Sequence, residues 1–293
     1  MSPPAGGDNP HVGVEHYENF PVASLLCPPA LRPAVVAIYH FARTADDIAD
    51  EGGAPSSQRL AELGAYRVEL DAMLDGRPGG GGWPEIFGPL ALAHARHALP
   101  RQPLHDLLDA FEQDVRNPPY PDRDALLAYC RRSANPIGRL LLHLYGVDGR
   151  DELERADAIC TALQLINFWQ DLGRDQPRGR NYLPQADLAR HGLPAVASSP
   201  LSDGPALRAC LRELCEWAQT LMRRGAPLAL RLPGRVGWEL RLVVQGGLRI
   251  LEKIERLQHG TLQARPTLGK RDLPLLLWRA LRMNPGANRQ GRA

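Results

Sequence analysis

Residues 152–175 place the strongest constraint on the fold, because they combine one polar stripe with an otherwise apolar helical pattern. Gln164, Asn167, Asp171 and Asp175 follow one another at intervals of three or four residues, so they share one face of a helix. The positions between them carry Leu, Ile, Phe and Trp. A stripe walled by such residues is unusual on a surface helix, and buried polar groups need partners. The pattern predicts a long helix whose polar face lines a site.

A second acidic motif lies near residue 50, in the segment Arg-Thr-Ala-Asp-Asp-Ile-Ala-Asp-Glu. Asp46 and Asp50 are four residues apart, as are Asp171 and Asp175, which brings the Cβ atoms of each pair within about 5–6 Å on a helix. Like charges at this spacing destabilise a helix, and a cation between them removes the cost. Mg²⁺ prefers carboxylate oxygens and completes its shell with water and substrate phosphates. Two facing motifs would hold a metal cluster and a diphosphate.

Asp71 and Asp75 provide an internal comparison, because they have the same spacing without the same surroundings. They close a helix just before a glycine-rich loop, with no Arg, Asn or Gln in register. A lone pair of aspartates at this spacing is usually a solvated surface feature. We interpret Asp71 and Asp75 as solvated and expect them to be inert.

The helical periodicity of Leu and Ala predicts an all-α fold. The 293 residues suffice for one large domain with a sizeable core, and no strand pattern, repeat, Gly-x-Gly-x-x-Gly or P-loop motif is present. We expect a single-domain helical bundle with a central cavity over residues 16–283, and disordered segments at 1–15 and 284–293. A first helix starts near Pro29–Pro33, and further helices are expected at about 57–74, 85–98, 102–115, 122–145, 152–175, 205–231 and 234–258.

Charge and cysteine content narrow the class of protein. The formal net charge of +2 gives no electrostatic case for nucleic acid. The five cysteines are scattered without zinc-like spacing, which favours a reducing, cytoplasmic compartment. The first residues lack the basic and apolar regions of a signal peptide, and no apolar run has the length of a membrane span. Residues 270–282 are basic and amphipathic, a pattern more often found at a core than at a membrane.

From about His16 to Arg282, the chain resembles the squalene/phytoene synthase family of isoprenoid synthases. Five segments in the family's order carry the resemblance: residues 16–21 (HYENFP), 37–50 (AIYHFARTADDIAD), 129–138 (YCRRSANPIG), 164–175 (QLINFWQDLGRD) and 179–184 (GRNYLP). The resemblance implies an isoprenoid-synthase bundle in which both acidic motifs bind Mg²⁺ and the substrate diphosphate. It also implies that Arg43, just before the first motif, grips phosphate.

Carried over residue by residue, the resemblance implies a catalytic metal centre at the two motifs. Its expected ligands are Asp46, Asp50, Asn167, Asp171 and Asp175, with Asp47 the weaker candidate. Arg178 and Tyr182 are expected to donate to phosphate oxygens, although solvation of the arginine and packing of the tyrosine stay open. The remaining substrate contacts are expected from the polar Gln164, from the aromatic residues Phe20 and Tyr129, one or both of Phe168 and Trp169, and from the small residues Ala134 and Gly138.

Within the family, residues 16–24, 133–142 and 167–172 resemble the hydroxysqualene synthase branch of bacterial hopanoid biosynthesis. This branch implies ionisation of presqualene diphosphate and capture of the cation by water. Two alternatives stay open: a head-to-head condensing prenyltransferase, and a non-catalytic helical partner of such enzymes. Lipid-soluble substrates also keep open a peripheral membrane association and contact with other enzymes of squalene synthesis.

Overall fold

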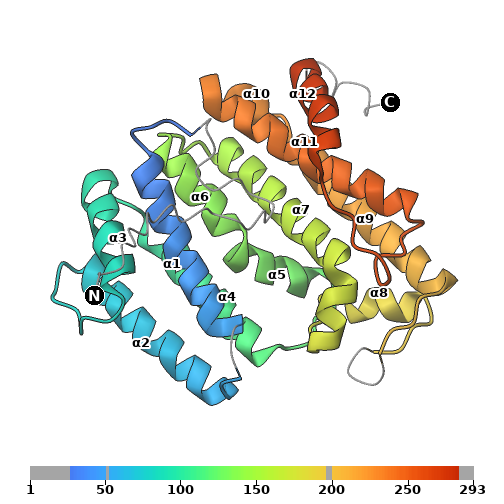
Figure 1. Cartoon of the computed structure of the whole chain (residues 1–293), viewed down its shortest axis with the longest axis horizontal. Coiled ribbons are helices and arrows are strands. Elements are labelled where there is room, and N and C mark those ends of the chain that lie inside the picture. Colours follow the sequence, from blue (N-terminus) through green and yellow to red (C-terminus); the bar gives the residue numbers. More distant parts are fainter. Residues whose placement is uncertain (1–26, 51–52, 196–199, 284–293) are drawn as a thin grey trace, which may run out of the picture.

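The computed structural model describes residues 27–50, 53–195 and 200–283, and every regular element in these ranges is helical (Figure 1). Phe20 and the two expected disordered segments lie outside the described residues. The elements are α1 Arg32–Asp50, α2 Ser56–Leu74, α3 Pro84–His97, α4 Arg101–Arg116, α5 Arg123–Ser133, α6 Asn135–Leu144, α7 Arg150–Asp175, η1 Gln176–Arg178, α8 Gln185–Arg190, α9 Pro205–Gly225, α10 Leu228–Arg231, α11 Gly234–Arg256, η2 Lys270–Asp272 and α12 Leu273–Arg282. The all-α prediction is confirmed.

The long helix α7 occupies the middle of the bundle, as Figure 1 shows. It packs against α9 and α11 on one side and against α5 and α6 on the other. One apolar core surrounds α7 and α9, while a second joins α1 to α4 and reaches α6 through Leu140 and Leu144. The polar stripe of α7 therefore lies in the interior of a bundle rather than on its outer surface.

Proline accounts for two differences between the expected and observed helices. The single helix expected over 122–145 is divided at Ala134 into α5 and α6, with Pro136 in the first turn of α6. Proline has no N–H to donate, so it cannot make the hydrogen bond to the preceding turn that would continue a helix. The helix expected over 205–231 is likewise divided into α9 and α10, with Pro227 just before α10.

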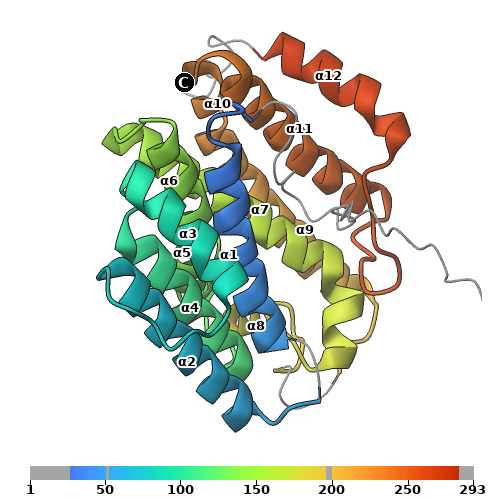
Figure 2. The same ribbon diagram turned by 60° about the vertical axis from the view of Figure 1, so that its left-hand side comes forward.

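The C-terminal part of the described chain returns along the outside of the bundle. After α11, an irregular segment leads through η2 to α12, which packs on α11 at the edge of the molecule (Figure 2). None of the helices in the described ranges is both long and apolar enough to cross a membrane.

Candidate active site

The predicted stripe is the least buried face of the second half of α7. From Ala158 to Leu172 every side chain is buried except those of Gln164, Asn167 and Asp171. Asp175 continues the same face at the last turn and is also only partly buried. The second half of α7 thus carries large apolar residues on its buried faces, and its partly exposed row is the one with oxygen-rich side chains.

The first motif occupies the C-terminal turns of α1. Arg43 pairs with Asp46 at 3.0 Å and with Asp47 at 2.6 Å, so this arginine already neutralises part of the motif. Asp50, at the end of α1, pairs with Arg180 from the segment that follows α7 and η1. This ion pair links the end of the first motif to the segment that directly follows the second motif.

Asp175 has a raised pKa, which burial and neighbouring carboxylates both cause. Burial is the main cause that raises this pKa to about 6, and the charge of Asp171 raises it further. Arg180 and Arg178 act in the opposite direction, while Asp50 from the first motif adds to the increase. An ionised Asp175 is therefore destabilised by both motifs, which is the electrostatic setting that a bound cation would relieve.

Asp114 of α4 is a member of this acidic cluster that the sequence interpretation missed. Its carboxylate accepts a hydrogen bond of 2.9 Å from the hydroxyl of Tyr129. Burial raises the pKa of Asp114 to about 7; the bond from Tyr129 lowers it, and the charges of Asp50 and Asp46 raise it. The sequence offers no signal here, because Asp114 has no acidic residue three or four positions away.

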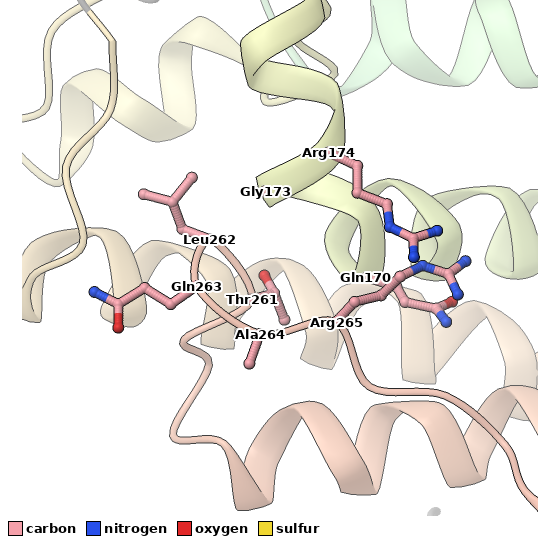
Figure 3. Close-up of a pocket in the computed structure, with 8 residues that line it drawn as sticks. All are labelled: Gln170, Gly173, Arg174, Thr261, Leu262, Gln263, Ala264 and Arg265. Atoms are coloured by element: carbon pink, nitrogen blue, oxygen red, sulfur yellow. The ribbon is translucent and has the colours of Figure 1, made fainter.

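A second missed residue, Arg265, comes from the irregular segment between α11 and η2. Its guanidinium forms a two-point contact with Asp171, with Nη2 3.1 Å from one carboxylate oxygen. The segment can approach α7 because residue 173 is glycine: a Cβ there would lie 2.3 Å from the carbonyl oxygen of Leu262. Figure 3 shows Arg265 on this segment beside Gln170 and Arg174 of α7, where they line a pocket of about 190 Å³.

Aromatic rings pack beside the carboxylates. Tyr182 stacks on Phe168 with ring centroids 3.7 Å apart and an interplanar angle of 7°. Tyr129 and Tyr120 lie within about 6 Å of the same tyrosine ring. Burial holds the pKa of Tyr182 well above its usual value, so its hydroxyl stays protonated. Trp169 is fully buried in the core, which leaves Phe168 as the ring nearer the site.

The two small residues expected to leave space for prenyl chains have different surroundings. Gly138 lies against α7, and a Cβ at this position would be 2.6 Å from the Sγ atom of Cys160. The glycine therefore allows α6 and α7 to pack closely. Ala134 is partly exposed at the break between α5 and α6. Next to it, the buried Asn135 accepts a hydrogen bond of 2.9 Å from the hydroxyl of Thr161.

The remaining expected residues divide by exposure. Arg178 is exposed in η1 and acts on Asp175 through its charge. Gln164 is partly exposed on the polar stripe.

Asp71 and Asp75 are each paired with basic side chains: Asp71 lies near His105, and Asp75 contacts both Arg77 and Arg101. That pair is thus at the surface, as expected, and held by local partners.

The donor set fits a hard divalent cation, although arginines hold part of it. Within the described ranges, no three His, Cys, Asp or Glu side chains are already gathered as a metal site. Instead, Arg180 forms an ion pair with Asp50 of the first motif, and Arg265 forms one with Asp171 of the second. Carboxylate and amide oxygens are the ligands that Mg²⁺ accepts. Burial, and then the charge of Asp171, raise the pKa of Asp175, and a bound cation would favour its ionised form.

Comparison with known proteins assigns this arrangement to a family. The sequence matches the family described as squalene/phytoene synthase over residues 14–272. The chain belongs to this family. Enzymes of the squalene/phytoene synthase family process prenyl diphosphates and generally use a divalent metal.

Individual relatives of the chain are similar over most of its length. A hydroxysqualene synthase from Rhodopseudomonas palustris is 36% identical over 81% of this chain and 80% of the relative. A presqualene diphosphate synthase from Zymomonas mobilis is 33% identical over 69% of this chain and 67% of the relative. Among solved structures, squalene synthase HpnC from Alicyclobacillus acidocaldarius is 35% identical, with a TM-score of 0.74 over 84% of this chain and 90% of that one.

Proposed function

We propose that this protein is a hydroxysqualene synthase, which converts presqualene diphosphate and water into hydroxysqualene and diphosphate. The observation that carries the proposal is the pair of facing acidic motifs, joined by the contact of Arg180 with Asp50. The similarity to the Rhodopseudomonas hydroxysqualene synthase over most of both chains supports this branch of the family.

The proposed metal is Mg²⁺, which the oxygens of Asp46, Asp50, Asn167, Asp171 and Asp175 would hold. When bound, it would neutralise the charge that develops on the leaving diphosphate. Arg43, Arg180 and Arg265 already lie at the acidic motifs. Their guanidinium groups are the fixed donors from which diphosphate oxygens would receive charge-assisted hydrogen bonds.

Residues of the chain would also stabilise the carbocation that forms when diphosphate leaves and direct its reaction with water. Tyr182 stacks on one ring face of Phe168, and the opposite face would stabilise positive charge on the substrate. Tyr129 stays protonated because burial raises its pKa well above the usual value. It would therefore present no phenolate that could react with the carbocation. The break at Ala134 interrupts the backbone hydrogen bonds between α5 and α6. We propose that this polar break is where the capturing water is held.

The test uses purified full-length protein with Mg²⁺ and presqualene diphosphate, and products are identified by mass spectrometry. We expect hydroxysqualene without NADPH, and no diversion to squalene when NADPH is added. In ¹⁸O-labelled water the alcohol oxygen should carry the label, because it comes from the captured water rather than from the diphosphate. An unlabelled alcohol would refute water capture.

A second candidate is the preceding condensation, favoured by the 33% identity to the Zymomonas presqualene diphosphate synthase. Farnesyl diphosphate offered alone distinguishes the two functions. Robust formation of presqualene diphosphate would move the protein to the condensing branch. No turnover of either substrate would favour the non-catalytic partner.

We also propose that the protein works in the cytoplasm, peripherally at the inner face of the membrane. The substrate and product of the proposed reaction are long isoprenoids, which partition into lipid. None of the described helices crosses a membrane, so such an association would rest on a surface of the folded protein.

A further inference from the structure

Helix α12 presents an unusual concentration of apolar side chains to solvent. Leu273, Leu277, Trp278 and Leu281 are 54%, 51%, 50% and 65% exposed. Their spacing of four, one and three residues places them on one side of the helix. The opposite side, with Leu276 and Ala280, is buried against the rest of the protein. We call the four exposed residues the α12 face.

The residues of this face share one helix, whereas Leu257 and Leu268 lie in the irregular segment after α11, at 36% and 41% exposure. Val68 on α2 and Leu92 on α3 are 64% and 75% exposed, but each stands alone in its helix. Single exposed apolar residues are normal on protein surfaces, whereas a cluster of them marks an interaction site. The α12 face therefore holds four of the eight large apolar side chains that are exposed in the described chain.

The border of the α12 face is cationic. Lys270 and Arg271 are exposed just before the helix, and Arg282 is exposed at its end. The Arg282 guanidinium lies 4.5 Å from the centroid of the Trp278 ring, so charge and aromatic surface are presented together. This combination favours a partner with an apolar interior and an anionic boundary.

Nearby acidic residues do not cancel that charge, because they are bound to cations on the inner side. Asp272 is buried and contacts both Arg249 and Lys253. These contacts hold its pKa well below the usual range, although burial alone would raise it. Glu252 is held between Arg249 and Arg279. The outward charge of the segment is thus contributed by Lys270, Arg271 and Arg282.

We propose that the α12 face docks the protein on an anionic phospholipid bilayer. Leucine and tryptophan side chains would enter the boundary of the acyl chains, while the basic border meets the lipid phosphates. A helix of 10 residues would lie in the plane of the interface, since it is too short to span. This inference rests on the membrane location proposed above and names the surface responsible. Its test needs no turnover, so its failure leaves the proposed reaction untouched.

The experiment measures flotation of the full-length protein with phosphatidylcholine vesicles, with and without phosphatidylglycerol. We expect binding only when the anionic lipid is present, and weaker binding at high salt. The double variant Leu277→Ser/Trp278→Ser should bind about tenfold or more weakly, because two apolar side chains no longer enter the interface. Removing the charge of Lys270 should weaken binding about fivefold.

The chain offers a matched control and an internal probe. Val68→Ser/Leu92→Ser removes two apolar side chains elsewhere that are even more exposed, and this variant should bind vesicles like the parent protein. Of the five tryptophans, all within the described ranges, only Trp278 is exposed. Its fluorescence should shift to shorter wavelength on addition of anionic vesicles, and Trp278→Phe should abolish the shift while retaining most of the binding.

Three results would overturn the proposal. The first is equal flotation of the parent protein and the Leu277→Ser/Trp278→Ser variant, and the second is no flotation of the parent protein at all. The third is a lipid-free dimer, seen by sedimentation equilibrium, that the same variant dissociates, because this would assign the α12 face to a second copy of the chain. Unchanged circular dichroism of the variant establishes that it is folded.

Discussion

Replacement of Asp114 by asparagine should stabilise the metal-free protein at pH 8 and leave its stability unchanged at acidic pH. Asparagine retains a side-chain oxygen that accepts the 2.9 Å hydrogen bond from Tyr129, so the geometry is kept. The variant removes the negative charge that burial and the charges of Asp50 and Asp46 oppose. The comparison therefore isolates the electrostatic cost of one carboxylate within the acidic cluster.

The sign and size of the expected change in unfolding free energy follow from the pKa of Asp114. Asp114 has a pKa of about 7 in the folded protein and 3.8 as its ordinary value, so folding favours the neutral acid. That stabilisation is complete below about pH 4 and is lost as the pH rises through 7. The two pKa values set an upper limit of roughly 4 kcal/mol. Partial contact of the carboxylate with solvent reduces the expected difference at pH 8 to about 1–3 kcal/mol.

The assay is urea unfolding of both proteins with a chelator present, at a series of pH values from 4.5 to about 8, a range set by the carboxyl titration. The midpoint of Asp114→Asn should exceed that of the parent at pH 8, and the two should converge as the pH falls. Asp75→Asn is the matched control, because Arg101 and Arg77 lower the pKa of Asp75. Ionised Asp75 stabilises the folded protein above its ordinary pKa. Asp75→Asn should therefore lower the urea midpoint in this pH range, the opposite of the effect of Asp114→Asn. Equal midpoints for Asp114→Asn and the parent at every pH would refute the reasoning.

Three further predictions concern the site and its packing. Asp50→Asn and Asp171→Asn should each lower turnover of presqualene diphosphate by about a hundredfold or more with unchanged circular dichroism, whereas Asp75→Asn should keep normal turnover; near-normal activity of Asp171→Asn would defeat the metal assignment. Mg²⁺ with inorganic diphosphate should raise the melting temperature more than Mg²⁺ alone, because diphosphate completes the metal shell and gives displaced arginines a new partner; an indifferent melting temperature in calorimetry would count against a diphosphate site. Gly173→Ala should lower the free energy of unfolding by about 1–3 kcal/mol, because its Cβ would meet a carbonyl oxygen at 2.3 Å. Gly64→Ala, which has open space in α2, should raise that free energy by about 0.5–1 kcal/mol, and equal effects of the two alanines on urea unfolding would contradict the packing argument.

The parts of the site that could be predicted from the sequence are those that repeat along a helix. Asp46 and Asp50 share a face, as do Asn167 and Asp171, because helical geometry fixes the relation of residues three or four apart. The same periodicity predicts α7 almost to its ends, and the structure gives it as Arg150–Asp175. Local spacing therefore gave both the polar stripe and the helix that carries it.

The residues missed by the sequence interpretation are single side chains brought in by tertiary packing. Asp114 of α4 interacts with Asp50 and Asp46 of the first motif, and Arg265 comes from an irregular segment placed against Gly173. Neither has a periodic neighbour that would distinguish it from a surface residue. Arg180 lies in the segment 179–184, and only the fold brings it to Asp50.

The ion pairs of the site also bear on the order of folding. Asp50 and Arg180 are 130 residues apart in sequence, and Asp171 and Arg265 are 94 residues apart. Helices of this bundle close through local contacts, but the Asp50–Arg180 pair must await the end of α7, and the Asp171–Arg265 pair must await the C-terminal third of the chain. During synthesis, both acidic motifs leave the ribosome well before Arg265. The acidic cluster should thus acquire its full set of countercharges only in the last stage of folding. In a hydrogen-exchange experiment during refolding, the amides at the end of α7 should become protected later than the amides of α1–α4.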